Sequence, residues 1–163
     1  MTRFEHTPFD VFLDLDGVFA DFDGKIRELT GFWPREIPKK ELWKTVYRQD
    51  DFFASLSMMH GADVLWEYFR PFKPTFLTGA PNSLKAQAQK VEWVKEKFGP
   101  EWVTIVLPKR DKQLHSGPRK LLVDDNAGNI EQWVAKGGYG FLYTGDAHGT
   151  ITQIEELRLA LLS

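Results

Sequence analysis

Two aspartates end an apolar run near the start of the chain, in the segment Val11-Phe12-Leu13-Asp14-Leu15-Asp16-Gly17-Val18. If this run is a β-strand, Asp14 and Asp16 point to the same side, because side chains alternate with a period of two. Two neighbouring carboxylates repel each other unless a cation lies between them. Mg²⁺ binds oxygen ligands and accepts one or two carboxylates beside water and phosphate, so the run indicates a metal site. The alternative is a solvated strand end that holds two acids.

Thr78 and Gly79 end a second apolar run, and a helix is expected to begin just after them, near Asn82 or Ser83. A hydroxyl group and free backbone N–H groups in a turn before a helix N-terminus form a site for an anion. An ordinary strand–turn–helix connection without a ligand would show the same pattern.

A second pair of acids, Asp124 and Asp125, follows the apolar run Leu121–Val123. Adjacent acids at the end of a buried strand are costly without a cation or hydrogen-bond donors. One of them, or Asn126, could instead serve only as the N-cap of the next helix. We expect Asp125 to bind the metal and Asp124 to orient the neighbouring groups.

A basic segment, Lys109–Lys112, precedes this second pair of acids. One of its lysines could neutralise charge on a phosphoryl oxygen, although such a loop could also be a solvated surface. Together with Asp14, Asp16, Thr78 and Asp125, a lysine would complete a site for phosphoryl transfer, which needs Mg²⁺, a cation and hydrogen-bond donors around the phosphate. One aspartate can form an aspartyl-phosphate, and a second can protonate the leaving alkoxide.

Five short apolar runs are expected to be the strands that position these residues, and helical patterns lie between them. After the second run, apolar residues recur at helical spacing at Leu84, Ala88, Val91, Val94 (or Trp93) and Phe98. A second helix is expected over Asn126–Lys136, after the fourth run. A third is expected over Thr150–Leu162, after the fifth run, with Ile151, Ile154, Leu157 and Leu161 on one face. Strands that alternate with helices predict an α/β fold with a parallel, helix-covered sheet. The expected strands are Phe9–Leu15, Pro74–Thr78, Val103–Leu107, Lys120–Val123 and Tyr139–Tyr143.

The first crossover is far longer than one helix requires, because about 55 residues separate Gly17 from Lys73. We expect a mostly helical insertion with helices near Asp21–Thr30, Lys39–Arg48 and Ala62–Phe69. Such an insertion lies over the carboxyl ends of the strands, where ligands of open α/β sheets bind, and is a candidate lid. The predicted organisation is therefore a core domain of residues 1–17 and 74–163 with a helical cap of residues 18–73.

Composition limits the classes of partner. The chain of 163 residues carries a net charge of −2, which gives no electrostatic footprint for a nucleic-acid duplex or an anionic membrane. It contains no cysteine, which excludes disulfides and thiolate metal sites and fits a reducing, cytoplasmic compartment. No apolar run approaches the length of a membrane span, and Met1–His6 lacks the apolar core of a signal peptide.

The motifs resemble those of the haloacid dehalogenase (HAD) superfamily of phosphatases. Asp14-Leu15-Asp16-Gly17-Val18 resembles the first motif of that superfamily, Thr78-Gly79 the second, the lysine the third and Asp124-Asp125 the fourth, in the right order along the chain. The resemblance implies a Rossmann-like three-layer parallel sheet with a small helical cap inserted after the first strand, and Mg²⁺ as the cofactor.

A narrower resemblance is to the 5'(3')-deoxyribonucleotidases, which hydrolyse nucleoside monophosphates. It is carried by Asp14–Phe22, Phe52-Phe53 with Gly61-Ala62, Trp93-Val94, Lys97–Pro100, Arg110-Asp111-Lys112 and Leu122–Asp125. The Arg-Asp-Lys segment indicates Lys112 as the lysine of the third motif.

The resemblance also implies a role for each site residue. Asp14 would be the nucleophile and a metal ligand, and Asp16 would be the general acid and base and would bind Mg²⁺ through its backbone carbonyl. The remaining roles are Asp125 as a metal ligand and Thr78, Gly79 and Lys112 as phosphate-binding groups.

In that family, aromatic side chains beneath the cap sandwich the base of the substrate. Phe22 lies at the matching distance after the first motif, and Leu42-Trp43 best matches a second aromatic segment, so Phe22 and Trp43 are the expected substrate-binding residues. Phe32-Trp33 could be aligned there instead, whereas Trp33 and Phe53 fit the core of the cap better. The chain departs from the family here, because the spacing is shorter and the alignment is loose, and again in Asn126-Ala127 after the fourth motif.

The leading hypothesis is a Mg²⁺-dependent phosphomonoesterase that hydrolyses nucleoside monophosphates, with deoxyribonucleotides favoured, through an aspartyl-phosphate. One alternative keeps the chemistry but takes a sugar phosphate or a nucleic-acid 3'-phosphate end as the substrate. Another is a binding scaffold without catalysis, which would be expected to lack Asp14, Asp16 or the lysine. An aromatic-rich cap could also form the surface of a homodimer.

Overall fold

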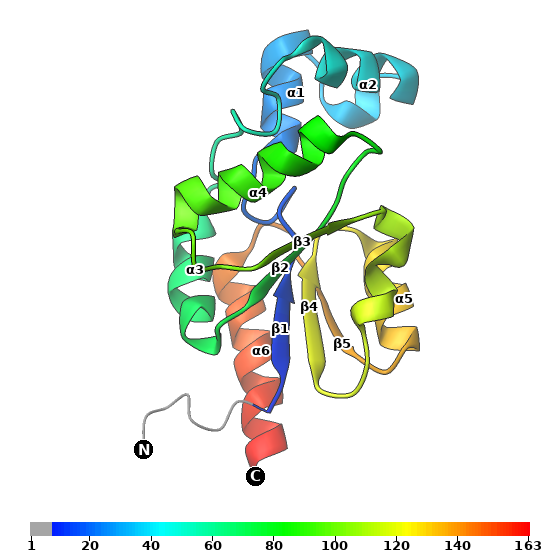
Figure 1. The fold of residues 1–163 in the computed structure, drawn as a ribbon. Coiled ribbons are helices and arrows are strands. Elements are labelled where there is room, and N and C mark those ends of the chain that lie inside the picture. The colour runs from blue at the N-terminus through cyan, green and yellow to red at the C-terminus, as the bar shows by residue number, and fades with distance from the viewer. Residues whose placement is uncertain (1–7) are drawn as a thin grey trace.

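A single sheet of five parallel strands forms the centre of the molecule, in the order β3-β2-β1-β4-β5 (Figure 1). The computed structural model describes residues 8–163, so the N-terminal stretch in which no signal peptide is expected lies outside it. Each pair of neighbouring strands is parallel, as the alternation of strands and helices predicts. The strands are β1 (Asp10–Leu13), β2 (Thr75–Gly79), β3 (Thr104–Leu107), β4 (Lys120–Asp124) and β5 (Tyr139–Leu142).

Helices cover both faces of the sheet and give three layers. They are α1 (Phe22–Thr30), α2 (Lys39–Arg48), α3 (Ala62–Phe69), α4 (Leu84–Phe98), α5 (Ala127–Ala135) and α6 (Ala147–Leu162), with short 3₁₀ helices at Pro34–Glu36, Arg70–Phe72 and Lys109–His115. One face packs on α3, α4 and α6 through residues such as Leu65, Trp93 and Ile154. The other face packs on α5, where Trp133 contacts Leu77 and Leu122. The predicted α/β class with a parallel sheet is confirmed.

The positions of the predicted strands and helices are close to the observed ones, but the buried face of α4 matches the expected one only in part. The structure buries Ala86, Lys90, Trp93 and Val94, whereas Leu84 is 84% exposed. The apolar pattern is therefore confirmed at Trp93 and Val94 and wrong at Leu84, in the first turn of the helix. In α6, Ile154 is buried as expected, but Leu161 is exposed because it lies near the C-terminal end, beyond the core.

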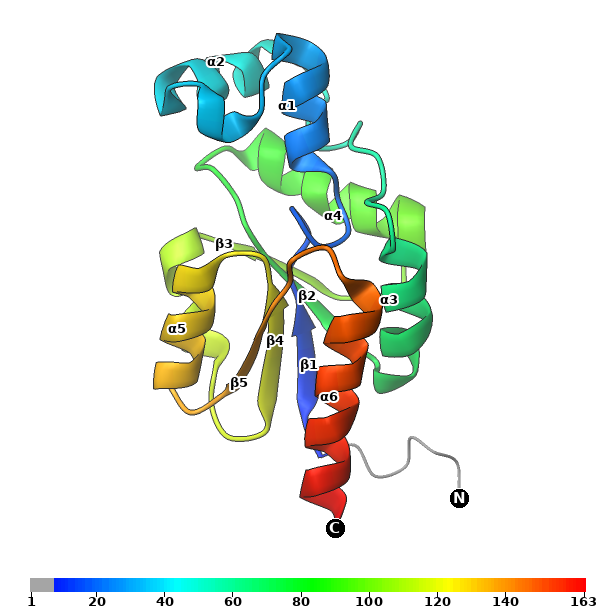
Figure 2. The same ribbon diagram turned by 180° about the vertical axis from the view of Figure 1, so that it is seen from behind.

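The long first crossover contains three helices where the sequence predicts them, and they do not all lie together. Helices α1 and α2 stand at one end of the molecule, beyond the carboxyl ends of the strands, whereas α3 lies beside α6 against the sheet (Figures 1 and 2). The chain leaves and rejoins the core at adjacent points, because Ala20 pairs with Met58 in an antiparallel bridge.

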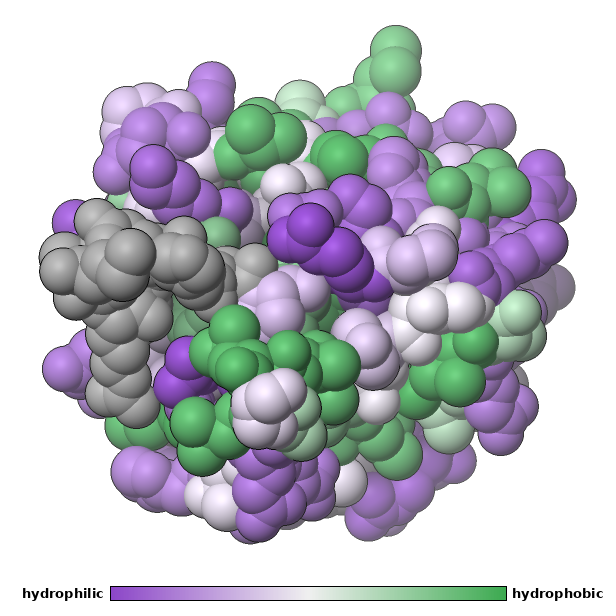
Figure 3. Space-filling model, turned by 90° about the horizontal axis from the view of Figure 1, so that it is seen from below, coloured by the Kyte–Doolittle hydropathy of each residue, from purple (hydrophilic) through white to green (hydrophobic). Residues whose placement is uncertain are grey.

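The opposite end of the molecule carries the C-terminus and shows apolar patches among polar residues (Figure 3). Leu159, Leu161 and Leu162 of α6 are exposed. Of the helices in residues 8–163, none combines the length with the apolar character that crossing a membrane requires.

Candidate active site

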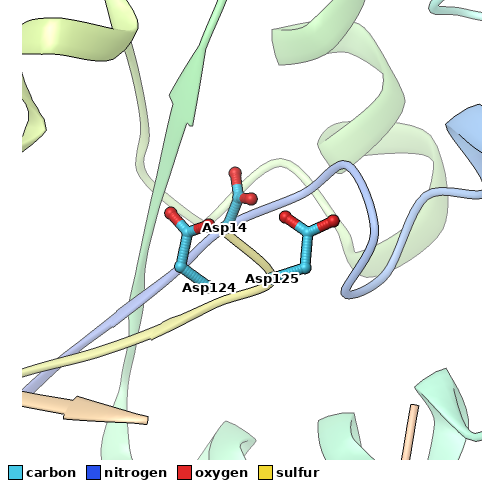
Figure 4. A group of neighbouring side chains, drawn as sticks. All are labelled: Asp14, Asp124 and Asp125. Carbon is cyan, nitrogen blue, oxygen red and sulfur yellow. The ribbon is translucent and has the colours of Figure 1, made fainter. Parts of the chain in front are cut away.

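The central strands β1 and β4 bring three carboxylates together at their carboxyl ends. Asp14 directly follows β1, Asp124 is the last residue of β4, and Asp125 comes next (Figure 4). One oxygen from each of the three carboxylates lies within 4.8 Å of the others. The order of the strands reverses between β1 and β4, and such a switch point is where open α/β sheets form a crevice for ligands.

Lys112 is buried between two of these acids. Its Nζ lies 2.8 Å from Asp14 Oδ1 and 2.8 Å from Asp124 Oδ2. Burial alone would lower the pKa of Lys112, but the two adjoining carboxylates outweigh it and raise the pKa above the usual range. The 3₁₀ helix that carries Lys112 therefore holds a permanent positive charge beside Asp14.

Asp124 is fully buried and has a hydrogen-bond partner on each carboxylate oxygen. Its Oδ1 accepts from the backbone N–H of Asn126 at 2.9 Å, and its Oδ2 accepts from Asn129 Nδ2 at 3.0 Å as well as from Lys112. Asn126 in turn caps α5 by accepting from the backbone N–H of Asn129. Asp124 thus orients Lys112 and the first turn of α5, which is the arrangement that the sequence suggested.

Asp125 is exposed and accepts no hydrogen bond from residues 8–163. Desolvation, then the charges of Asp124 and Asp16, raise its pKa to about 6. The pKa of Asp14 is also raised well above its ordinary value, first by burial and then by the neighbouring carboxylates, although Lys112 opposes the shift. The site is therefore short of positive charge at neutral pH.

Gly17 permits this close approach of the two strand ends. Its φ is +81°, a left-handed conformation that favours glycine. A Cβ atom at this position would overlap the carboxylate of Asp125. The turn after β1 is compact, since the carbonyl of Leu15 accepts from the backbone N–H groups of Val18, Phe19 and Ala20.

The chemistry of this set of acids fits a divalent cation. At the carboxyl ends of the strands, the described residues supply four carboxylates and two ammonium groups, which leave two negative charges in excess when all are ionised. These groups are those of Asp14, Asp16, Asp124, Asp125, Lys90 and Lys112. A hard dication with oxygen ligands, such as Mg²⁺, would balance this excess and relieve the repulsion that raises the pKa of Asp125.

Asp16 lies beside this group, and a second buried lysine holds it. Lys90 Nζ of α4 lies 2.6 Å from Asp16 Oδ2 and donates a hydrogen bond to Thr78 Oγ1 at 3.0 Å. Thr78 is 1% exposed, so its hydroxyl faces Lys90 and does not line the cavity above the carboxylates. The neighbouring Gly79 does line that cavity.

The cavity measures about 370 Å³ and opens above Asp14, Asp16 and Lys112. This volume lies within the range of small-molecule sites. Phe22, Trp43 and Phe53 form an aromatic wall contributed by the segment that contains α1 and α2. The ring centroids of Phe22 and Trp43 are 6.3 Å apart and those of Phe22 and Phe53 also 6.3 Å.

The expected pocket residues Phe22 and Trp43 therefore lie in the wall, and Phe53, which was expected to be cap core, joins them. The other aromatic candidate, Trp33, packs under Arg27, whose guanidinium carbon lies 4.5 Å from the centroid of the indole ring. Asp23 also lines the cavity, and its pKa is raised, first by burial and then by Asp21 and Asp16.

Lys90, Asn129 and Asp23 belong to this site but were not predicted from the sequence. Lys90 shares the buried face of α4 with Ala86 and Trp93 at helical spacing, a signal that points to Lys90 only once the orientation of the helix is known. Asp23 and Asn129 belong to helices whose first turns point toward the strand ends, and no motif in the sequence marks them.

The fold is similar to that of solved structures of HAD-superfamily hydrolases. A hydrolase from Streptococcus pneumoniae TIGR4 superposes with a TM-score of 0.55 at 13% identity, covering 93% of this chain and 100% of that chain. A HAD-superfamily hydrolase from Ehrlichia chaffeensis superposes with a TM-score of 0.55 at 12% identity, covering 96% and 98%. Likeness at this level of identity establishes the fold, and the fold is the one that the motif resemblance implies.

Among curated proteins, the mitochondrial 5'(3')-deoxyribonucleotidase of Mus musculus is similar to this chain. The two are 26% identical over 143 residues, which cover 71% of this chain and 63% of that protein. The chain thus spans less than two thirds of the length of this relative. No family model matches the sequence.

Proposed function

We propose that the chain is a Mg²⁺-dependent phosphomonoesterase that hydrolyses nucleoside monophosphates, with deoxyribonucleotides favoured, through an aspartyl-phosphate. The observation that carries the proposal is the position of Asp14 beside Lys112, at the base of a cavity with an aromatic wall. A carboxylate nucleophile, a fixed cation and clustered acids meet the needs of phosphoryl transfer. The distant similarity to a deoxyribonucleotidase supports the choice of substrate.

In the first step, a carboxylate oxygen of Asp14 attacks phosphorus and the bond from phosphorus to the ester oxygen breaks. Lys112 occupies Oδ1 of Asp14, so Oδ2 is the oxygen left to attack. Lys112 and Gly79, which both line the cavity, meet the phosphoryl oxygens. The leaving ester oxygen takes a proton from Asp16, which lines the same cavity.

In the second step, water attacks the phosphorus of the aspartyl-phosphate and gives a proton to Asp16. Inorganic phosphate leaves, and the carboxylate of Asp14 and the proton on Asp16 are both restored. Asp14, Asp125 and the backbone carbonyl of Asp16 would hold Mg²⁺, which supplies positive charge to the phosphoryl oxygens when bound.

The cap is the part of residues 18–73 that stands over this cavity, namely α1, α2 and the segment that carries Phe53. A flat aromatic base fits between apolar rings better than a polyhydroxylated sugar does, since the wall offers Phe22, Trp43 and Phe53 as stacking surfaces. Asp23 adds one hydrogen-bond acceptor to this wall.

The proposal is tested by phosphate release with Mg²⁺ across a panel of 5'- and 3'-nucleoside monophosphates, ribo and deoxy, sugar phosphates and a 3'-phosphorylated oligonucleotide. A clear preference for nucleotides supports it. A preference for another ester keeps the phosphatase chemistry and refutes the nucleotide assignment. Release from none of them would favour a binding scaffold.

A further inference from the structure

Lys90 is a lysine in the middle of α4 that is 2% exposed. Lysine is almost never fully buried unless its charge is paired, so a buried lysine needs a specific partner. Its ammonium lies 2.6 Å from Asp16 Oδ2, which is the shortest contact of either buried lysine with a carboxylate. Lys90 belongs to none of the motifs that the sequence suggests, because Lys112 already supplies the lysine of the third motif.

All three hydrogens of the Lys90 ammonium have an acceptor within the site. Two face Asp16 Oδ2 and Thr78 Oγ1, at 2.6 and 3.0 Å from Nζ. The third direction faces the ring of Phe53, whose centroid is 4.7 Å from Nζ. Groups from three separate parts of the chain thus fix the ammonium, and its position does not depend on solvent.

Lys90 does not line the cavity above Asp14, so it cannot touch a substrate there. The small void that it shares with Leu15 and Trp93 has a volume of about 10 Å³, which has room for one water molecule at most and none for a substrate. Two neighbours of its ammonium, Asp16 and Phe53, line both the void and the cavity, and of these only Asp16 has an oxygen that can exchange a proton with a substrate.

The contact also distinguishes the two oxygens of Asp16. Oδ2 accepts from Lys90, whereas Oδ1 accepts no hydrogen bond from residues 8–163. A carboxyl group held through one oxygen presents the other in a fixed direction. The oxygen that exchanges a proton with the substrate is then Oδ1.

We propose that Lys90 is a positioning residue, whose ammonium holds Oδ2 of Asp16 so that Oδ1 points at the leaving-group oxygen. The inference rests on the proposed phosphatase function and extends it. Each buried lysine then holds one carboxylate. Lys112 holds the nucleophile Asp14, and Lys90 holds Asp16, the group that transfers the proton.

The test compares Lys90→Met with Lys85→Met, a matched control on the same helix whose side chain is 60% exposed. Each variant is assayed on a nucleoside monophosphate, whose alkoxide must be protonated to leave, and on p-nitrophenyl phosphate, whose phenolate leaves without a proton. The quantity compared is kcat/KM, because it reports the steps up to departure of the leaving group.

We expect Lys90→Met to lower kcat/KM for the nucleotide by about 10- to 100-fold, a part of the full contribution of a general acid. The fall for p-nitrophenyl phosphate should be several-fold smaller, and Lys85→Met should change neither. Equal losses on both esters, or no loss on either, would overturn the proposal. Circular dichroism verifies folding, and if Lys90→Met does not fold, Lys90→Gln is judged by the same ratio of losses.

A double-mutant cycle with Asp16→Asn supplies the second criterion. If Lys90 acts through Asp16, Lys90→Met causes little further loss on the nucleotide in the Asp16→Asn background. A loss of the same size in both backgrounds would mean a merely structural role and would overturn the inference alone, because the wild-type protein still turns over both esters. A wild-type protein inactive on every ester would overturn the proposed function and this inference with it.

Discussion

The substitution Asp125→Asn should stabilise the metal-free protein at neutral pH while removing most of its response to Mg²⁺. The carboxylate of Asp125 has no hydrogen-bond partner among the described residues, and its pKa is raised to about 6 by burial and by Asp124 and Asp16. Ionised Asp125 therefore costs stability in the folded state, and an uncharged amide of the same shape removes that cost without breaking a contact.

The size of the stability change follows from the rise of the Asp125 pKa above its ordinary value of 3.8. A fully buried group with this shift would change the free energy of unfolding by about 3 kcal/mol. The carboxylate is partly desolvated, but the residue as a whole is exposed, so solvent screening reduces the effect to about 1 kcal/mol. For a chain of this length, that corresponds to a rise in Tm of about 2–4 °C.

The effect of the Asp125 carboxylate on the free energy of unfolding depends on pH. An acid whose pKa is higher in the folded state than in the unfolded state destabilises the fold above the folded pKa, and this cost disappears as pH falls through the window from about 6 to 3.8. The stabilisation by Asp125→Asn should therefore be full at about pH 7.5 and vanish near about pH 4.

The assay is thermal unfolding of both proteins, with chelator and with Mg²⁺, at both values of pH. Mg²⁺ at about 100 times its dissociation constant raises the free energy of unfolding of the wild-type protein by about 2.7 kcal/mol, which corresponds to about 5–11 °C in Tm. Asp50→Asn, which removes an exposed charge outside the cavity, is the control. A metal-free Asp125→Asn protein that melts below the wild type at about pH 7.5, or that keeps the full Mg²⁺ response, would refute the reasoning.

Three further substitutions probe the nucleophile, the buried cation and the aromatic wall. Asp14→Asn should abolish phosphate release while the circular dichroism spectrum stays unchanged, and substantial turnover would exclude Asp14 as the nucleophile. Lys112→Met leaves Asp14 and Asp124 buried without their cation, so it should lower the free energy of unfolding by about 3–5 kcal/mol in urea denaturation; a loss below about 1 kcal/mol would contradict the assigned ion pairs. Trp43→Ala should raise KM for nucleotides more than for p-nitrophenyl phosphate, and equal changes would show that Trp43 only packs the cap.

The strands and the acids that follow them were predictable because each signal is local. An apolar run that ends in Asp14 or Asp124 contains both the strand and the reactive side chain. The order of the strands follows from the handedness of parallel crossovers only in part, since placing β4 beside β1 requires the packing of the whole chain. The adjacency of Asp14, Asp124 and Asp125 is thus a tertiary fact that the motifs alone only suggested.

The parts that escaped prediction depend on contacts between distant segments. Lys90 lies 74 residues from Asp16 in the chain, and a lysine in a helix resembles any solvated lysine until the orientation of the helix is known. For the same reason, the apolar pattern predicted Leu84 on the buried face of the helix, although Leu84 is exposed. The role of Phe53 was likewise hidden, because a buried aromatic ring with one edge on a cavity has the same sequence signature as a core residue.

The bridge between Ala20 and Met58 joins the two ends of the long segment that leaves the core after β1. Backbone hydrogen bonds from Asp21 N–H to Ser57 O at 2.9 Å and from Met59 N–H to Phe19 O at 2.8 Å join the two crossings beneath α1 and α2. Because the ends of this excursion already meet, residues 22–56 could be exchanged for a segment of another length without displacing β1 or β4. If the proposed function holds, recognition and reaction are encoded in separable stretches of the chain, and selection can alter one while it preserves the other.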